Sequence, residues 1–334
     1  MIVRKDLSPD LSLKNPLAKR KLEKEIMKKE VESKSKIKVS AGDRTLEIIC
    51  YIVFSIAAFL CLYPFYYIII NTISANDLSA KGDILFWPKG IHFHNYMSAF
   101  RIDGLFQALK ISLLRTTLGT AFTVFASAYL GFMFTQEKMW LRKVWYRLIV
   151  ATMYFNAGII PWYLVMKTMH LTNNFWGYIL PAIVSPFNLI LTKTFVESVP
   201  KELQEAAEMD GAGVLTVFFK VIIPVIKPIM ATVAIFSAVS QWNAFQDTLL
   251  LMTDTKLYPL QFVLYQYLNQ ASSLASLAQS NTSTSSLAAA AATTQTTTSV
   301  RMTITVLVVL PIMLVYPIFQ KYFVKGIMIG AVKG

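Results

Sequence analysis

Long apolar stretches alternate with short polar segments from about residue 46 to the C-terminal end of the chain. Six of these stretches approach the ~20 apolar residues that a helix needs to cross the hydrocarbon core of a bilayer. They lie at about 46–70, 108–134, 144–166, 175–196, 228–252 and 299–323. The pattern therefore predicts an all-α integral membrane protein with six transmembrane helices.

Composition agrees with a membrane protein. Of the 334 residues, 55% are hydrophobic and 15% are charged, and the mean hydropathy is +0.50. A soluble domain usually carries about 25% charged residues. The formal net charge of +13 could indicate a nucleic-acid-binding protein, but much of the basic excess flanks the apolar stretches, as it does in membrane proteins.

The distribution of basic residues predicts the orientation. Residues 1–45 hold thirteen Lys/Arg and seven Asp/Glu and are interpreted as a basic cytoplasmic tail on anionic lipid. A nucleic-acid-binding arm would be expected to interleave aromatic residues, which are scarce here. An even number of spans puts both termini on one side. Further basic residues fall on that same side, at Lys138, Arg142, Lys143, Arg147, Lys321, Lys325 and Lys333.

A polar island, Glu205–Pro224, separates the fourth and fifth apolar stretches. Pro200 can open a helix, and Leu203, Ala206 and Ala207 would share one face of it. Gly211 and Gly213 are expected to end this helix, because glycine adopts positive φ readily. A second short helix is predicted from Val214 to Ile223, stopped by Pro224 and Pro228. An amphipathic surface hairpin without a partner is the simpler alternative.

The island resembles the EAA loop of ABC importer permeases. That pattern is Glu-Ala-Ala, three residues, Gly, nine residues, two aliphatic positions separated by one residue, and Pro. The matching positions, with the additional matches to carbohydrate-type permeases, are Glu205, Ala206, Ala207, Asp210, Gly211, Ala212, Phe218 and Pro224. The resemblance implies a cytoplasmic coupling helix, in a loop spanning residues 199–227, that docks on a separate ATPase. All of these except Phe218 are the candidate coupling residues.

Other segments resemble carbohydrate permeases, especially the lipoprotein-linked and polysaccharide-fragment branch of Gram-positive bacteria. They are Pro88-Lys89, Asn95-Tyr96, Trp242-Asn243 and the final residues 301–334. The resemblance covers about 46–334, the expected permease domain, and is weak only in 271–299. That Ser/Thr/Ala-rich outer insert is interpreted as a flexible linker or as a loop that reaches the sugar-binding protein.

Aromatic and amide side chains in the third, fourth and fifth stretches are candidates for the substrate path, because rings stack on sugar C–H surfaces and amides bond hydroxyl groups. The candidates are Asn156, Trp162, Tyr163, Asn188, Gln241, Trp242, Asn243 and Asp247. Two of these candidates have a simpler interpretation, and so do two charged residues within the apolar stretches. Trp242 could be an interfacial anchor, Asp247 a solvated carboxylate near the outer end, and Arg115 and Lys193 edge residues that extend toward water.

The chain lacks a Gly-x-x-x-x-Gly-Lys-Ser/Thr motif, so ATP and magnesium are assigned to a partner ATPase, with no cofactor in this chain. Familiar hydrolase motifs are also missing, and His92 and His94 have no evident third metal ligand. The resemblance implies a bacterial plasma-membrane importer of sugar, with an oligosaccharide as the expected cargo. Its partners would be a homologous second permease, two ATPase copies and an extracellular solute-binding protein. The alternatives are an ion-coupled secondary carrier, with Asp247 as its carboxylate, and an intramembrane enzyme.

Overall fold

The computed structural model describes residues 41–280, 299–315 and 317, which form helices and connecting loops with no strand among them. The prediction of an all-helical chain is confirmed for these residues. The chain divides into two compact units, residues 1–64 and 65–334. Most of the predicted basic tail and most of the 271–299 insert lie outside the described residues. The first ten residues of the insert continue helix α14 (Leu260–Ser280).

Helix α2 (Ala41–Thr72) corresponds to the first predicted span and contains Pro64, where the first unit ends. The last turns of α2 belong to the second unit. They contact the following loop, which contains α3 (Asn76–Lys81) and α4 (His94–Phe100). Asn95 donates to the Thr72 carbonyl at 2.9 Å, and the Tyr96 hydroxyl lies 2.7 Å from the Thr72 hydroxyl. The Asn95-Tyr96 pair therefore fixes the loop to the end of α2.

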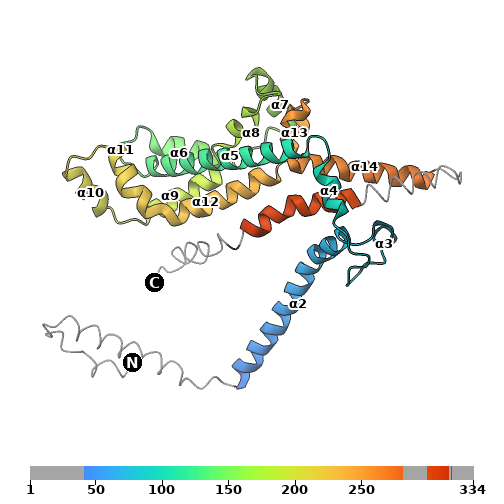
Figure 1. The fold of residues 1–334 in the computed structure, drawn as a ribbon. Coiled ribbons are helices and arrows are strands. Elements are labelled where there is room, and N and C mark those ends of the chain that lie inside the picture. The colour runs from blue at the N-terminus through green and yellow to red at the C-terminus, as the bar shows by residue number, and fades with distance from the viewer. Residues whose placement is uncertain (1–40, 281–298, 316, 318–334) are drawn as a thin grey trace. The chain divides into compact units, whose positions relative to one another are not determined.

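The core of the second unit is built from α5 (Leu105–Met133), α9 (Pro186–Glu197) and α12 (Ile223–Asn243), with α5 in contact with both other helices. Figure 1 shows α5 and α12 side by side along their length. Two glycines allow this close packing. A Cβ at Gly119 would lie 2.8 Å from the Gln241 side chain, and one at Gly131 would lie 3.0 Å from Thr192. Small residues at such contacts let membrane helices approach each other.

The predicted third span is not one helix. Residues 144–166 are divided between α6 (Arg142–Ala151) and α7 (Ile159–Thr168). The interruption coincides with Asn156-Ala157-Gly158, where Gly158 has φ +85° and its amide donates to the Asn156 side chain at 2.9 Å. This local turn replaces helical hydrogen bonds, which explains the break.

The predicted fourth span is also broken. It comprises α8 (Trp176–Ile179), one 3₁₀ turn, η1 (Leu180–Ala182), and α9, with a bend of 47° between the two halves. Ser185 caps α9 through the Asn188 amide, and Pro186 occupies the first helical position, where no amide donor is needed. The bend is therefore built into the sequence at Ser185-Pro186.

The prediction that a separate short helix from Val214 to Ile223 ends at Pro224 is wrong. Instead α11 (Val214–Val217) continues through a π-helical turn, η2 (Phe218–Ile222), into α12, giving one helix from Val214 to Asn243. Pro224 and Pro228 are carried within this helix. A π turn widens the backbone locally, and helices in membrane proteins tolerate proline where neighbouring elements relieve the lost bond.

Three described helices are long and apolar enough to cross a membrane, namely Gly42–Thr72, Leu105–Met133 and Val214–Asn243, and the bent pair is a fourth candidate. The fifth predicted stretch ends in a separate helix, α13 (Gln246–Leu251), followed by η3 (Thr255–Leu257). The sixth is described as the shorter helix Ser299–Val315, and residues 318–323 of its predicted range lie outside the described part.

Candidate functional site

The second unit has two candidate sites, at opposite ends of the antiparallel pair α5 and α12. A cavity lies at the C-terminal end of α12, and the polar island packs at its N-terminal end. Twenty-six residues separate Val214 from Ser240, so at 1.5 Å per residue the two sites are about 40 Å apart. Figure 1 shows α10 and α13 at the two ends.

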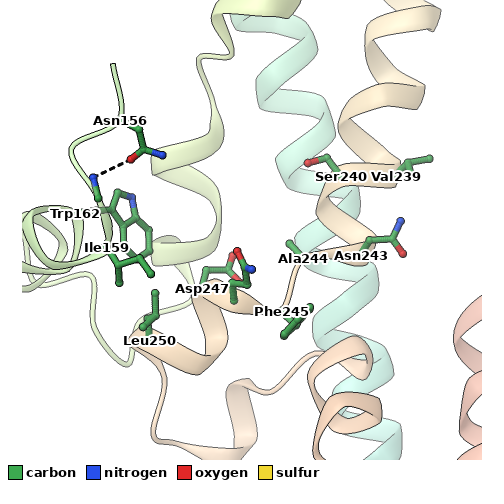
Figure 2. Close-up of a pocket in the computed structure, with 12 residues that line it drawn as sticks. Asn156, Ile159, Trp162, Val239, Ser240, Asn243, Ala244, Phe245, Asp247 and Leu250 are labelled. Carbon is green, nitrogen blue, oxygen red and sulfur yellow. Dashed lines mark hydrogen bonds between the residues drawn. The ribbon is translucent and has the colours of Figure 1, made fainter. Parts of the chain in front are cut away.

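The cavity has a volume of about 690 Å³ and three walls. One wall is the start of α7 with its preceding turn, the second is the last turns of α12, and the third is α13 with the link before it. Figure 2 shows Asn156 and Trp162 on one side and Ser240 and Asn243 on the other. The full lining is Asn156, Gly158, Ile159, Trp162, Val239, Ser240, Asn243, Ala244, Phe245, Gln246, Asp247 and Leu250.

The lining combines aromatic rings with uncharged hydrogen-bonding groups. Trp162 and Phe245 offer aromatic surface, while Asn156, Asn243 and Gln246 offer amides. Amides both donate and accept, as sugar hydroxyl groups do. Concave sites that mix apolar surface with a few polar groups are typical of small-molecule binding. The cavity can therefore hold a polyhydroxylated ligand.

Four of the predicted substrate-path residues line the cavity: Asn156, Trp162, Asn243 and Asp247. The other four do not. Trp242 and Gln241 are buried on the opposite face of α12, and the Trp242 indole donates to the Val308 carbonyl at 3.0 Å. Tyr163 packs against the hydrophobic cluster around Tyr178, and Asn188 is buried in α9. Helical rotation by about 100° per residue explains why neighbours in one motif separate onto different faces.

The prediction that Asp247 is a solvated carboxylate is wrong, and so is the prediction that Arg115 extends to an edge. Arg115 is 2% exposed and pairs with Asp247, which is 19% exposed. Lys193 does not reach open solvent either, because its side chain is 15% exposed, pairs with Glu197 at 2.6 Å and lies over the Tyr146 ring. Sequence position alone could not reveal the partner of Arg115, which is 132 residues away, whereas Lys193 and Glu197 are four residues apart on one helix.

Eight cavity residues were not among the sequence candidates, and three of these eight carry a polar or aromatic side chain: Ser240, Phe245 and Gln246. Ser240 and Asn243 are three residues apart, so they share one helical face. That spacing was the available signal for Ser240. Phe245 and Gln246 depend on the break after α12, which the sequence pattern did not predict.

At the other end, helix α10 (Glu202–Met209) contains Glu205, Ala206 and Ala207 and begins two residues after Pro200. Gly211 has φ +82°, as predicted, and its amide donates to the Glu208 carbonyl at 3.0 Å, while the Ala212 amide donates to the Ala207 carbonyl at 2.9 Å. These two bonds form a Schellman motif. Gly213 does not share this geometry, because its φ is −70°.

The two alanines of the motif have different surroundings. Ala207 and Ala212 pack against the hydrophobic cluster around the fully buried Phe218, whose ring contacts Tyr129 and Phe132. Ala206 is exposed and lies on the same face as Leu203 and Met209, which are 44% and 88% exposed. The predicted face of Leu203, Ala206 and Ala207 is therefore corrected to Leu203, Ala206 and Met209, at three-residue spacing. Asp210 and Pro224 are also exposed.

The loop between α5 and α6 is tied to α10 by polar contacts. Lys138 pairs with Glu208 at 2.8 Å, Lys201 with Glu137 at 3.2 Å, and Gln136 donates to Gln204 at 3.1 Å. The basic residue Lys138 and the polar island, which sequence analysis assigned to the same side, are thus neighbours. The site at this end is a short helix, held by a neighbouring loop, with an exposed apolar stripe.

A helical chain with several apolar spans, a polar cavity at one end of its central helices and an exposed helix at the other defines an integral membrane transport component. The chain belongs to the binding-protein-dependent transport system inner membrane component family, whose model matches residues 123–329. It is a permease subunit of an ABC importer, and its part in that machine is transport rather than catalysis.

Two relatives from Bacillus subtilis (strain 168) illustrate the similarity. Protein LplC is 33% identical over 273 residues, covering 82% of this chain and 90% of the relative. The polygalacturonan/rhamnogalacturonan transport system permease protein YtcP is 30% identical over 292 residues, covering 87% and 99%. A chain in the crystal structure of a bacterial ABC transporter involved in the import of the acidic polysaccharide alginate is 28% identical, with a TM-score of 0.74, covering 85% of this chain and 98% of that one.

Proposed function

We propose that this subunit passes a sugar, in the form of an oligosaccharide, from an extracellular binding protein to the cytoplasm. Several relatives carry names of sugar transporters, among them YtcP and the melibiose/raffinose/stachyose import permease protein MelC of Bacillus subtilis. The observation that carries the proposal is the cavity, because its rings and amides complement the C–H faces and hydroxyl groups of a sugar.

The stripe on α10 would receive the ATPase. Leu203, Ala206 and Met209 form a shallow apolar patch that a groove on another protein can approach closely. The whole motif, Glu205, Ala206, Ala207, Asp210, Gly211, Ala212 and Pro224, serves coupling in this proposal. Glu205, Asp210 and Pro224 are exposed, whereas Ala207, Gly211 and Ala212 set the orientation of α10.

Coupling follows from continuity between the two sites. One helix runs from Val214, two residues after Ala212, through Pro224 of the coupling motif to Asn243 in the cavity wall. When ATP closes the ATPase dimer, the coupling helices move together and the cavity turns outward. ATP shifts this equilibrium only by its different affinity for the two states. No ATP site is required in this chain, since ATP and magnesium are bound by the ATPase.

The assembly would contain a homologous second permease, two copies of the ATPase and an extracellular solute-binding protein, in the plasma membrane of a bacterium. We assign six passes to this chain and place both termini in the cytoplasm. Lys138, Arg142, Lys143 and Arg147 lie at the α10 end, which supports a cytoplasmic position for that end. The 1–45 tail would lie on anionic lipid, and the 271–299 insert would be an outer loop near the binding protein.

A secondary carrier driven by ions is disfavoured by one contact. Such a carrier needs a carboxylate that can gain and lose a proton or cation during transport. In the described part of the chain, Asp247 is the only acidic residue of the cavity lining, and it is held in a bidentate pair with Arg115.

The proposal is tested by purifying this chain with the products of co-expressed neighbouring genes and measuring the native mass of the complex. We expect one homologous permease and two ATPase copies for each copy of this chain. A lone chain or a homo-oligomer that still moves sugar would contradict the proposal and would make Asp247 the first residue to mutate.

A further inference from the structure

Arg115 is a charged residue in the middle of an apolar helix. It lies ten residues from the start of α5, about 15 Å along the helix axis, and is fully enclosed. An ionised side chain in a membrane span is energetically unfavourable, so such residues are retained where they have a partner and a role. The role of Arg115 can be read from its contacts.

The guanidinium group of Arg115 joins several elements. Its Nε donates to Gln241 on α12 at 3.1 Å, and Nη1 donates to the Ala244 carbonyl and to Asp247 Oδ1, each at 3.2 Å. Nη2 donates to Asp247 Oδ2. The guanidinium carbon lies 4.4 Å from the centre of the Tyr178 ring on α8. One side chain on α5 thus contacts α12, α13, their link and α8.

These contacts fall at the break between two helices. α12 ends at Asn243, Ala244 turns into an extended conformation with ψ 131°, and α13 begins at Gln246. A carbonyl at a helix end lacks its intrahelical donor, and Arg115 supplies one to Ala244. The residues around this break, Asn243 to Asp247, all line the cavity. Arg115 is therefore in a position to set the shape of this wall.

The same contacts set the charge of the wall. Among the described residues, Asp247 is the only charged one that lines the cavity, while Arg115 is not part of the lining. Arg115 lies behind Asp247 and neutralises it without offering a cation to the ligand. An anionic sugar would meet the exposed edge of Asp247 and find no positive group, whereas a neutral sugar can donate hydroxyl hydrogen bonds to that edge.

We propose that Arg115 is a positioning residue that fixes the α12–α13 break and cancels the charge of Asp247, so that this subunit forms a wall selective for uncharged saccharides. The selectivity for saccharides rests on the proposed function, whereas the charge of the wall does not. The two statements can therefore be tested separately.

The first test measures the electrostatic potential of the cavity without any sugar. Ser240→Cys is introduced into the assembled importer, with Cys50 and Cys61 of this chain replaced by alanine. Methanethiosulfonate reagents carrying either a sulfonate or a trimethylammonium group are applied, and labelling is read from the mass of this chain. The ratio of anionic to cationic labelling rates should rise about fivefold in Asp247→Asn, where Arg115 is uncompensated, and fall about as much in Arg115→Gln.

Controls for this test come from the same chain. The double variant Arg115→Gln/Asp247→Asn should return the ratio to the wild-type value, because neither charge remains. Neutralising the ion pair of α9 with Lys193→Gln/Glu197→Gln should leave the ratio unchanged. If Arg115→Gln does not assemble, Asp247→Asn and the double variant still decide the result. An equal ratio in wild type, Asp247→Asn and the double variant overturns the proposal.

The second test compares two trisaccharides of equal length and linkage, trigalacturonate and α-1,4-linked galactotriose, at concentrations that saturate the binding protein. Vesicles containing the complete importer should take up galactotriose at least about fivefold faster, and Asp247→Asn should narrow this preference. Faster uptake of trigalacturonate by the wild type contradicts the selectivity. If neither sugar is imported, galactose-based trisaccharides are not the cargo, while the thiol-labelling result still decides the role of Arg115.

Discussion

The two ends of the α5–α12 pair hold their charges in opposite ways. At the cavity end, Arg115 is enclosed, with 2% of its side chain exposed, and its partner Asp247 is 19% exposed. At the α10 end, the side chains of Lys138 and Glu208 are 79% and 40% exposed, and Lys201 and Glu137 are similarly open. Removing one partner of an enclosed pair is strongly destabilising because a buried charge is left unpaired, whereas exposed pairs contribute little to stability. The comparison predicts that substitutions at the charged pair of the cavity end will be much more costly than substitutions at the charged pairs of the α10 end.

Breaking the enclosed pair should have the largest effect on stability. Arg115→Gln leaves Asp247 partly buried without its partner, and we expect a loss of about 3–5 kcal/mol. Thermal unfolding of the purified complex measures it. Removing both charges with Arg115→Gln/Asp247→Asn should recover most of this loss, because the unpaired charge causes the destabilisation. A double variant as unstable as Arg115→Gln alone would show that the individual hydrogen bonds, not the charge balance, stabilise the wall.

The next largest effect should come from the turn after α10, and it should affect transport rather than assembly. Gly211 has φ +82° and donates a hydrogen bond to Glu208, and Gly211→Pro removes both features. We expect uptake to be abolished while the chain still inserts in the membrane. Gly213→Ala is the matched control, because Gly213 has φ −70° and no atom near its Cβ position. Normal uptake by Gly211→Pro would remove this turn from the coupling pathway.

The two tryptophans near the cavity should give different phenotypes. Trp162 lines the cavity, so Trp162→Ala should raise the sugar concentration for half-maximal uptake by roughly two- to tenfold, corresponding to about 0.5–1.5 kcal/mol of ring contact. Trp242 is buried and bonds the Val308 carbonyl, so Trp242→Phe should lower thermal stability with little change in that concentration. Uptake kinetics and thermal unfolding of both variants measure the contrast. The opposite assignment of effects would return Trp242 to the substrate path.

The smallest effect is expected from the exposed pairs beside α10. A double-mutant cycle with Lys138→Gln and Glu208→Gln should give a coupling energy below about 1 kcal/mol, measured by thermal unfolding. The coupling should decrease further as salt is raised. A coupling energy comparable to that of Arg115 and Asp247 would contradict the distinction between the two ends.

The sequence predicted some features of the fold and missed others. The helical class, the approximate positions of the first two spans and the positive φ of Gly211 follow from local rules and agree with the structure. The breaks in the third and fourth predicted spans did not follow from apolar content alone, although Asn156-Ala157-Gly158 and Ser185-Pro186 cause them locally. The helix end predicted at Pro224 is absent, because a π turn just before it maintains the helix.

The cavity was harder to predict because it depends on contacts between distant segments. Periodicity along α12 separates Asn243 from Gln241 and Trp242, but only if the end of the helix is known. The partner of Asp247 lies 132 residues earlier in the chain. No local pattern encodes that pairing. Arg115 within an apolar stretch was nevertheless visible as an anomaly, and such residues in a membrane helix deserve a functional interpretation by default.

The most direct test of the account is sugar uptake driven by ATP in vesicles that contain the complete importer. Uptake and ATP hydrolysis are measured in the same vesicles for the wild type and for Ala206→Trp, which places a large ring on the exposed stripe of α10. The account predicts uptake by the wild type that requires hydrolysable ATP and is lost in Ala206→Trp, although the variant is present in the membrane. Equal uptake by both proteins, or uptake without ATP, would contradict it.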